Sequence, residues 1–169
     1  TFHPETMSAL SPVDQVDQLI AALDDYADVF MVITLSNADA GGQSVSKRLI
    51  EFGKRRNNVI VRNSLGYLFY LSCVASFDLV IGNSSSGIIE APFFGTPTIN
   101  IGDRQAGREM ADTIISVPCE KTAIRIGISQ ALQDVRKRAV DRAKLPYGKS
   151  NATQEIVSIL ERLSADIVS

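Results

Sequence analysis

Three consecutive serines, Ser84, Ser85 and Ser86, stand between two glycines in the stretch GNSSSGIIEAPFFGTP, residues 82–97. The stretch follows an apolar run at 77–81 with the composition of a strand, and it continues into a run with helical spacing. A helix that begins here would direct free backbone N–H groups and the positive end of its dipole at a ligand. Hydroxyls add further donors, so the corner favours a phosphate. Serines at the start of a helix are also ordinary caps, and this second interpretation stays open.

The corner matches neither of two common phosphate-binding glycine motifs. The spacing G-x-x-x-x-G occurs between Gly82 and Gly87, and both glycines allow a close backbone approach. However, Ile88 and Ile89 occupy the positions where a P-loop carries Lys and Ser or Thr. The dinucleotide fingerprint G-x-G-x-x-G is absent from the corner and does not follow the first predicted strand. We therefore expect neither a P-loop nor a bound NAD.

Glu90 is the one acid in the predicted short helix, among Ile88, Ile89, Ala91 and Phe93. A carboxylate about one turn into such a helix can accept two hydrogen bonds from vicinal hydroxyls, as acids do when they bind a ribose. The alternative is that Glu90 lies on a solvated face of the helix.

A second polar cluster, NIGDRQAGRE at 100–109, follows the next predicted strand. Arg104 and Arg108 are four residues apart and would share one face if this segment were helical. Arginines beside a phosphate-favouring corner indicate an anion clamp. The alternative is that they form surface ion pairs with Asp103 or Glu109.

His3 is the only histidine of the chain, and it follows a predicted strand end. It could therefore face the same crevice, although a single histidine is more often structural than catalytic. With one histidine and no close pair of carboxylates at the strand ends, we expect no dedicated metal site.

Apolar runs rich in β-branched residues alternate with segments of helical periodicity along the chain. Strands are predicted over 29–36, 58–64, 77–82, 96–102 and 113–118. Helices are predicted over 14–27, 44–55, 66–76, 86–95, 122–135 (with a second short helix after it) and 151–163, where Ile156, Ile159, Leu160 and Leu163 share a face. This alternation predicts one α/β domain over residues 1–169, a Rossmann-like, doubly wound parallel sheet with helices on both faces. Ligands of such sheets bind beyond the carboxyl ends of the strands, where the serine corner and the arginines lie.

Composition excludes some classes of partner. The formal net charge is -2, so the chain has no bulk basic field for nucleic acid or for a membrane surface. No stretch reaches the roughly 18 apolar residues that cross a bilayer, and no secretory signal is visible at the start. The chain opens TFHPE without an initiator Met, which we interpret as a piece of a longer protein.

The run GNSSSGIIEAPFFGTPTINIGDRQAGRE, residues 82–109, resembles the second domain of UDP-N-acetylglucosamine 2-epimerases. It is most similar to the hydrolysing kind that serves the synthesis of sialic and related nonulosonic acids. TFHPET at 1–6 is similar to the start of the same domain, and the resemblance extends over essentially the whole chain. It implies a GT-B architecture of two Rossmann-like domains, of which this chain is the C-terminal, UDP-binding one. It also implies a cytoplasmic protein without a cofactor, a UDP-sugar as substrate, an N-terminal domain that this chain lacks, and a homodimer at full length.

The resemblance also implies roles for individual residues. The helix start with its serines would bind the diphosphate, Glu90 the ribose, and Leu65 in the loop 63–67 the uracil. Arg104 would approach the diphosphate or the sugar, and His3 would lie near both across the cleft. The implied catalytic residues are His3 and Arg104, and the implied UDP-binding residues are Leu65, Ser84, Ser85, Ser86, Gly87, Glu90, Arg104, Gln105 and Arg108.

The implied reaction eliminates UDP from UDP-N-acetylglucosamine and hydrates the resulting glycal to N-acetylmannosamine. The acids and bases that act at C2 would lie largely on the other domain, so we expect the isolated domain to be inactive. The corner N-S-S-S-G, followed by the single Glu90, favours the hydrolysing branch. A non-hydrolysing epimerase, a GT-B glycosyltransferase and a non-catalytic nucleotide-sugar-binding module remain alternatives, and the identity of the hexosamine stays open.

Overall fold

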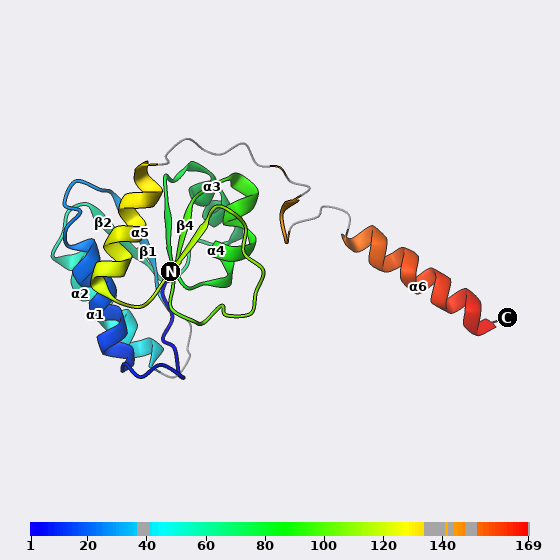
Figure 1. The fold of residues 1–169 in the computed structure, drawn as a ribbon, viewed down its shortest axis with the longest axis horizontal. Helices are drawn as coiled ribbons and strands as arrows, with labels where there is room; N and C mark the ends of the chain where they lie inside the picture. Colours follow the sequence, from blue (N-terminus) through cyan, green and yellow to red (C-terminus); the bar gives the residue numbers. More distant parts are fainter. Residues whose placement is uncertain (37–40, 134–140, 142–143, 148–151, 169) are drawn as a thin grey trace.

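The computed structural model describes residues 1–36, 41–133, 141, 144–147 and 152–168, and the side chains of the last helix as far as residue 163. Strands and helices alternate along most of this length (Figure 1). The strands are β1 (Met31–Thr34), β2 (Val59–Arg62), β3 (Val80–Gly82), β4 (Thr98–Ile101) and β5 (Ile114–Val117). The helices are α1 (Pro12–Leu23), α2 (Gly42–Lys54), α3 (Tyr67–Ser76), α4 (Ser85–Ile89), the 3₁₀ turn η1 (Ala91–Phe94), α5 (Lys121–Gln133) and α6 (Ala152–Val168).

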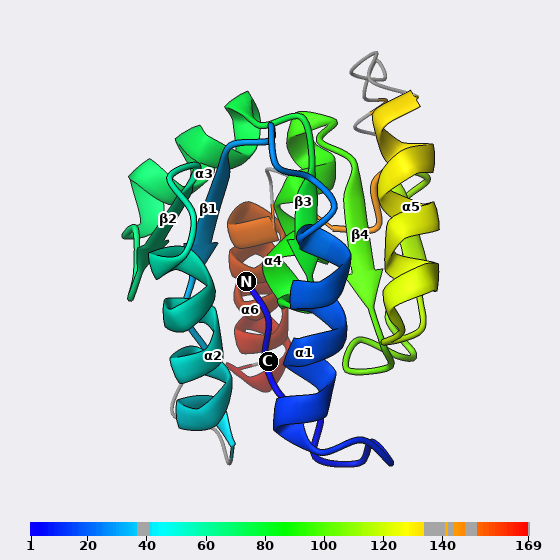
Figure 2. The same cartoon turned by 90° about the vertical axis from the view of Figure 1, so that its left-hand side faces the viewer.

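Helices cover both faces of the strands, as the alternating pattern predicts. On one face α1 lies between α2 and α5, and on the other face lie α3, α4 and η1 (Figure 2). All four residues of β4 are buried, and its sequence TINI combines two isoleucines with two uncharged polar residues, as suits a strand that is covered on both faces. Ile99 of β4 joins Leu19 of α1 and Ile124 of α5 in the main core. The predicted α/β class with parallel strands is confirmed.

The strands form two parallel groups rather than one continuous sheet. β1 pairs with β2, and β4 pairs with β3 on one side and with β5 on the other. Among the described strands none is hydrogen-bonded to both β1 and β3, so the parallel strands lie in two hydrogen-bonded groups. The start of the chain enters the space between them, where the Thr1 amine donates to the carbonyl oxygen of Ile81 at 3.3 Å.

The predicted helix over 86–95 is divided into α4 and η1. Pro92 has no backbone N–H to continue an α-helical ladder, and it lies in the first turn of η1. Gly95 then ends η1 with a positive φ of 70°. The other predicted elements are present with shorter strands. The second short helix predicted after residue 135 falls mostly outside the described part, and residues 37–40 of the predicted loop lie outside it.

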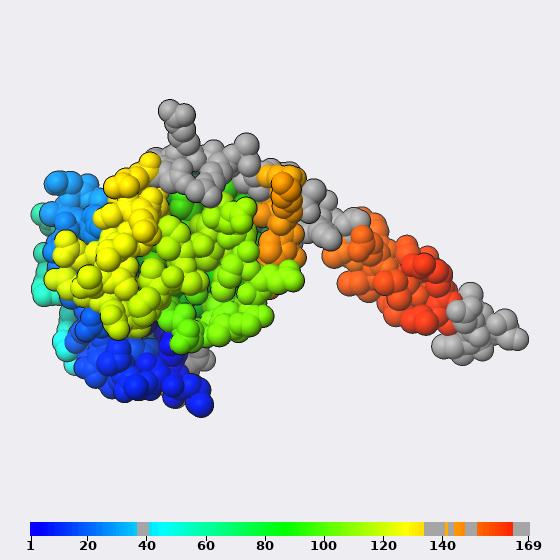
Figure 3. Space-filling view, viewed as in Figure 1, coloured from blue at the N-terminus to red at the C-terminus, as the bar shows by residue number. Residues whose placement is uncertain are grey.

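α6 lies apart from the α/β body (Figures 1 and 3). The apolar side chains that share its face in the helical pattern are about half exposed, namely Ile156, Ile159, Leu160 and Leu163. In the described part of the chain no helix has both the length and the apolar character needed to span a membrane.

Candidate functional site

The serine corner lies at the carboxyl end of β3, where the chain turns directly into α4. Ser84 is the N-cap residue, with φ -70° and ψ 143°, and its hydroxyl accepts a hydrogen bond from the Ser86 N–H at 3.4 Å. Ser85 and Ser86 occupy the first turn, and all three serines are partly exposed. Gly87 is buried against β4, so closely that a Cβ there would come within 2.9 Å of Thr98 Cγ2. The capping role predicted as an alternative therefore holds for Ser84, while the first turn of α4 still faces the surface.

Tyr70 of α3 reaches the same corner, and its hydroxyl is hydrogen-bonded to the Ser86 hydroxyl. Burial raises the pKa of Tyr70, the Ser86 hydrogen bond lowers it, and the Glu90 charge raises it further. The phenol therefore stays protonated at neutral pH. Tyr70 was not among the predicted site residues, since its position in α3 gives no local sign of contact with a segment 16 residues later.

Glu90 ends α4, and its backbone N–H donates to the Ser86 carbonyl oxygen at 2.9 Å. The side chain is only partly exposed, and its Oε2 is buried without a hydrogen-bond partner in the described part of the chain. A buried carboxylate oxygen without a donor is costly, so this atom is suited to accept a hydrogen bond from a ligand.

Asn83 is the polar centre of the site, and it was not among the predicted residues. Its side-chain oxygen accepts from the His3 N–H at 2.7 Å, and its side-chain nitrogen donates to the His3 carbonyl oxygen at 2.8 Å. His3 is thereby held against the end of β3, although 80 residues separate the two in the chain. His3 is buried to 4% exposure, and its Nδ1 lies 3.1 Å from the Ser36 hydroxyl at the end of β1. His3 therefore belongs to the carboxyl edge of the strands, beside the serine corner.

The arginine segment also converges on Asn83, but it is not helical. Arg104 Nη1 donates to the Asn83 carbonyl oxygen at 3.3 Å, and Gln105 Nε2 donates to the same oxygen at 2.8 Å. Residues 103–108 form successive turns, with Gly107 at a positive φ of 82°. Arg104 and Arg108 therefore do not share a helix face, and this prediction is corrected. Both are exposed, whereas Gln105 is buried and its Oε1 has no partner among the described residues.

Glu5 anchors the arginine segment from the opposite side. Its Oε1 accepts a hydrogen bond from the backbone N–H of Arg104 at 3.1 Å, and Gly102 leaves room for this carboxylate because a Cβ there would collide with it. Arg104 is therefore held at its backbone N–H by Glu5 and at its guanidinium by the Asn83 carbonyl oxygen. Glu5 could not be identified from sequence, since its partner lies 99 residues away.

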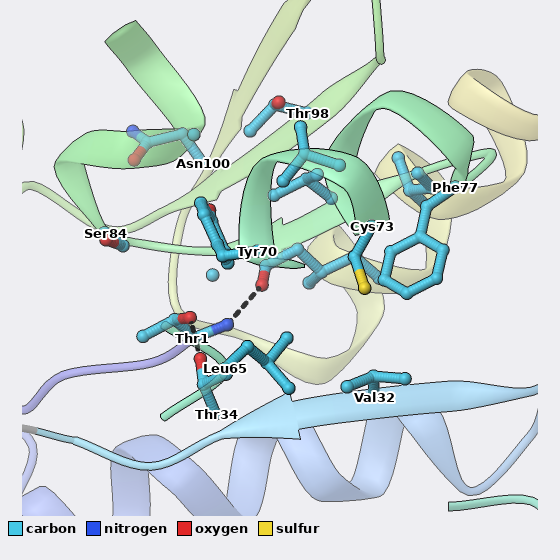
Figure 4. A pocket seen from close by; sticks show the side chains of 16 residues that line it. Thr1, Val32, Thr34, Leu65, Tyr70, Cys73, Phe77, Ser84, Thr98 and Asn100 are labelled. Atoms are coloured by element: carbon cyan, nitrogen blue, oxygen red, sulfur yellow. Dashed lines mark hydrogen bonds between the residues drawn. The ribbon is translucent and has the colours of Figure 1, made fainter. Parts of the chain in front are cut away.

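Leu65 lies beside the serine corner rather than in it. Leu65, Tyr70, Ser84 and Gly87 line one cavity of about 80 Å³, which extends along the strands toward Thr1 (Figure 4). The loop that carries Leu65 turns at Gly66, whose φ is 68°, and leads into α3. This cavity is too small for a nucleotide, so a ligand of that size would lie on the open edge beyond the strands.

Within residues 1–36, 41–133 and the other described segments, no group of three or more His, Cys, Asp or Glu side chains could hold a metal ion. The polar groups at the edge are hydroxyls, amides, the imidazole, the carboxylates of Glu5 and Glu90, and the guanidinium of Arg104. This set offers both donors for an anion and acceptors for hydroxyls.

The family described as UDP-N-acetylglucosamine 2-epimerase matches residues 1–161 of the chain. The chain belongs to the UDP-N-acetylglucosamine 2-epimerase family. The polysialic acid biosynthesis protein P7 of Escherichia coli is 37% identical over 164 residues, which are 95% of this chain and 41% of that protein. The GDP/UDP-N,N'-diacetylbacillosamine 2-epimerase (hydrolyzing) of Campylobacter jejuni is 38% identical over 116 residues, or 68% of this chain and 30% of that protein.

Among solved structures, the co-structure of S. aureus MnaA with UDP is similar in fold to this chain, with a TM-score of 0.70. The identity is 15%, and the match covers 99% of this chain and 46% of MnaA. The chain thus spans less than half the length of the relatives it matches. The epimerase family and the α/β fold are established by these matches, while the activity of a whole protein is a matter for proposal.

Proposed function

We propose that this chain is the UDP-binding half of a hydrolysing UDP-N-acetylglucosamine 2-epimerase. The observation that carries the proposal is the convergence of His3, Arg104 and Gln105 on Asn83, directly beside the serine corner, in a chain of this family. Three segments far apart in the sequence thereby present polar side chains to one edge of the strands. The edge is the position at which parallel α/β sheets bind their ligands.

The diphosphate would lie over the first turn of α4, against Ser84, Ser85, Ser86 and the backbone of Gly87. Backbone N–H groups of the turn and the serine hydroxyls supply neutral donors, and Arg104 supplies charge from the neighbouring strand end. Arg108 would add to the positive field from its exposed position. The two clusters complement each other, because an anion held between them is contacted from two sides.

The uridine would extend from the diphosphate toward Glu90 and Leu65. The unpartnered Oε2 of Glu90 is an acceptor without a donor, and a ribose hydroxyl would complete it. Leu65 would pack on the uracil from the loop before α3. Gln105 would use its unpartnered Oε1 toward the ligand while its amide nitrogen holds Asn83.

In the proposed reaction UDP leaves C1 of the sugar while a base removes the proton at C2, and water then adds to the glycal. Negative charge grows on the diphosphate as the bond to C1 breaks. Arg104 and the donors of α4 would therefore stabilise the transition state more than the bound substrate. His3 would act from the same edge near the phosphates and the sugar. The groups that act at C2 would come from an N-terminal domain, with a homodimer in the cytoplasm as the working form.

The proposal is tested by calorimetric titration of the full-length protein with UDP. Glu90→Ala should weaken UDP binding by about 1–3 kcal/mol, the cost of losing hydrogen bonds to a charged group. Glu51→Ala is the matched control, since Glu51 is an exposed acid on α2, and it should leave the affinity unchanged. ADP should not bind. Equal UDP affinity in the wild type and Glu90→Ala would remove Glu90 from the ribose site.

The products decide between the hydrolysing reaction and the alternatives within this family. Incubation with UDP-N-acetylglucosamine should release UDP and free N-acetylmannosamine in equal amounts. Formation of UDP-N-acetylmannosamine without free sugar would instead assign a non-hydrolysing epimerase. Arg104→Ala should lower kcat more than it raises KM, because the charge that Arg104 meets is greatest in the transition state.

A further inference from the structure

Two hydroxyl groups, from Tyr70 and Ser86, meet where α3 and α4 approach each other at the serine corner. Tyr70 lies near the start of α3, where its N–H donates to the Gly66 carbonyl oxygen at 3.0 Å. Ser86 lies in the first turn of α4. The two hydroxyls are hydrogen-bonded to each other, and both residues are partly exposed. The pair is therefore within reach of a ligand at the corner.

The position of the Tyr70 ring is fixed by the packing of α3. Val74 follows Tyr70 by four residues, so the two share one face of the helix. Val74 is 2% exposed, and its carbonyl oxygen accepts a hydrogen bond from the buried Thr96 hydroxyl at 2.7 Å. Tyr70 and Ser84 line the same cavity beneath this face (Figure 4). The phenol thus reaches Ser86 from an element that is anchored independently of Ser86.

The chemistry of the two hydroxyls decides which of them donates. A phenol is a stronger acid than an alcohol and a weaker acceptor, and burial raises the pKa of Tyr70, which keeps its proton in place. Tyr70 is therefore the donor and Ser86 Oγ the acceptor. The phenol oxygen is left with acceptor capacity alone, and an acceptor is unsuited to contact a phosphate oxygen. Any effect of Tyr70 on a bound anion must therefore pass through Ser86.

The Ser86 hydroxyl keeps its own proton for a further partner. In the described part of the chain, the bond with Tyr70 is the one hydrogen bond that this hydroxyl makes. The Ser86 N–H is directed at the Ser84 hydroxyl, at 3.4 Å. Ser86 can thus serve an anion at the corner through its side chain rather than through its backbone. A hydroxyl that accepts a hydrogen bond is also a stronger donor, because successive hydrogen bonds polarise one another.

Ser86 differs in this respect from the two serines before it. The Ser84 hydroxyl caps α4, and the Ser85 hydroxyl makes no hydrogen bond with the described residues. Among the three, Ser86 is the one whose hydroxyl is bonded to a side chain of another helix. A donor that is oriented before the ligand arrives needs little reorganisation when charge develops on that ligand.

We propose that Tyr70 is a positioning residue of the diphosphate site, whose phenol donates to Ser86 Oγ and directs the Ser86 proton at a diphosphate oxygen. The inference rests on the proposed function, because it requires a diphosphate over the first turn of α4. No proton is transferred in this arrangement. As UDP leaves, charge grows on the diphosphate and the polarised hydroxyl binds it more strongly, so Tyr70 stabilises the transition state more than the bound substrate.

Calorimetric titration of the full-length protein with UDP tests the inference through a double-mutant cycle. Tyr70→Phe should raise the Kd about 3- to 10-fold, and Ser86→Ala should raise it at least as much. In the Ser86→Ala background the Tyr70→Phe change should have no further effect, because its only route to the ligand is then missing. A purely structural role of Tyr70 would weaken binding equally in both backgrounds, and that result would overturn the proposal.

Tyr26→Phe is the matched control. The Tyr26 hydroxyl also lies beside a serine hydroxyl, that of Ser129 on α5, at 3.5 Å, on the other face of the strands. The variant makes the same chemical change away from the corner and should leave the Kd for UDP unchanged. Tyr70→Phe retains the ring, so its Tm should stay close to that of the wild type. An unchanged Kd in folded Tyr70→Phe would overturn the proposal.

The same experiment separates this inference from the proposed function. UDP binding that Glu90→Ala weakens and Tyr70→Phe does not would leave the proposed function in place and remove the role of Tyr70. A wild-type protein that does not bind UDP would overturn both.

Steady-state kinetics with UDP-N-acetylglucosamine supply a second readout. Tyr70→Phe should lower kcat more than it raises KM, and Tyr26→Phe should change neither. A higher KM with an unchanged kcat would contradict the proposal, because Tyr70 would then support the bound substrate and the transition state equally.

Discussion

At the scale of single residues, the Asn83 side chain holds His3 against the end of β3. Its side chain makes one accepted and one donated hydrogen bond with the His3 backbone, at 2.7 and 2.8 Å, and it is 1% exposed. Asn83→Ala leaves both His3 groups buried and unpaired, so we expect a loss of about 1–3 kcal/mol in the free energy of unfolding. Chemical denaturation of wild type and variant measures this loss.

Asn58→Ala is a useful comparison, because Asn58 also bonds to backbone, but in an exposed environment. Asn58→Ala should lower the free energy of unfolding by less than Asn83→Ala does. If the two variants lose the same free energy of unfolding, the two hydrogen bonds between Asn83 and His3 add nothing to the stability of the fold.

The site residues that the sequence predicts are those whose spacing is local, and their roles stay predictions. The three serines and Glu90 occupy one turn and its end, so their spacing alone placed them at a corner. Asn83 and Tyr70 were missed because their roles depend on contacts with segments that lie 80 and 16 residues away. The helix expected for Arg104 and Arg108 failed because Gly107 adopts a positive φ, which the four-residue spacing does not reveal.

At the scale of elements, the fit between the chain start and β3 requires the glycine at position 82. Gly82 has a φ of 143°, and a Cβ there would collide with the Thr1 carbonyl group. Gly82→Ala should therefore displace Thr1–His3 from β3 and lower the free energy of unfolding by about 1–3 kcal/mol or more. Gly66→Ala is the control that shows the effect of backbone strain without a collision. Gly66 also has a positive φ, of 68°, but no atom lies within 4 Å of the added Cβ.

Denaturation curves of the two variants should differ clearly, with Gly82→Ala the less stable. Equal losses would show that the contact with Thr1 is dispensable and that only the φ value matters at position 82.

The order and type of the elements were predictable, because hydrophobic period changes along the chain from helical to continuous apolar runs. The division of the strands into two groups was not predictable from the sequence, because it depends on which strands lie side by side in the fold. The break between α4 and η1 has a local cause in Pro92 and Gly95, and both residues are visible in the sequence.

At the scale of the whole molecule, the α/β body and α6 differ in what their apolar side chains contact. Ile33, Leu49 and Ile99 are buried in one core, whereas Ile156 and Leu160 of α6 are more than half exposed. Helical periodicity predicted both kinds of helix equally well, because it reports an apolar face and not the partner of that face. Global stability therefore rests on the body, and the position of Thr1 in the middle of that body makes it sensitive to pH.

The stability of the 169-residue chain with a free Thr1 amine should rise between pH 6 and pH 8. The amine has a pKa of about 6 when folded and about 8.0 when unfolded, so in this range the unfolded chain binds more protons. A difference of about two pKa units corresponds to a gain of about 2–3 kcal/mol in the free energy of unfolding as the pH rises from 6 to 8.

Acetylation of Thr1 removes the charge and serves as the control, while His3 and all other groups titrate in both chains. Denaturation at several pH values should show the acetylated chain more stable at pH 6 and the two chains converging by pH 8. A stability difference that does not change with pH would mean that the Thr1 amine is solvated rather than buried between β1 and β3.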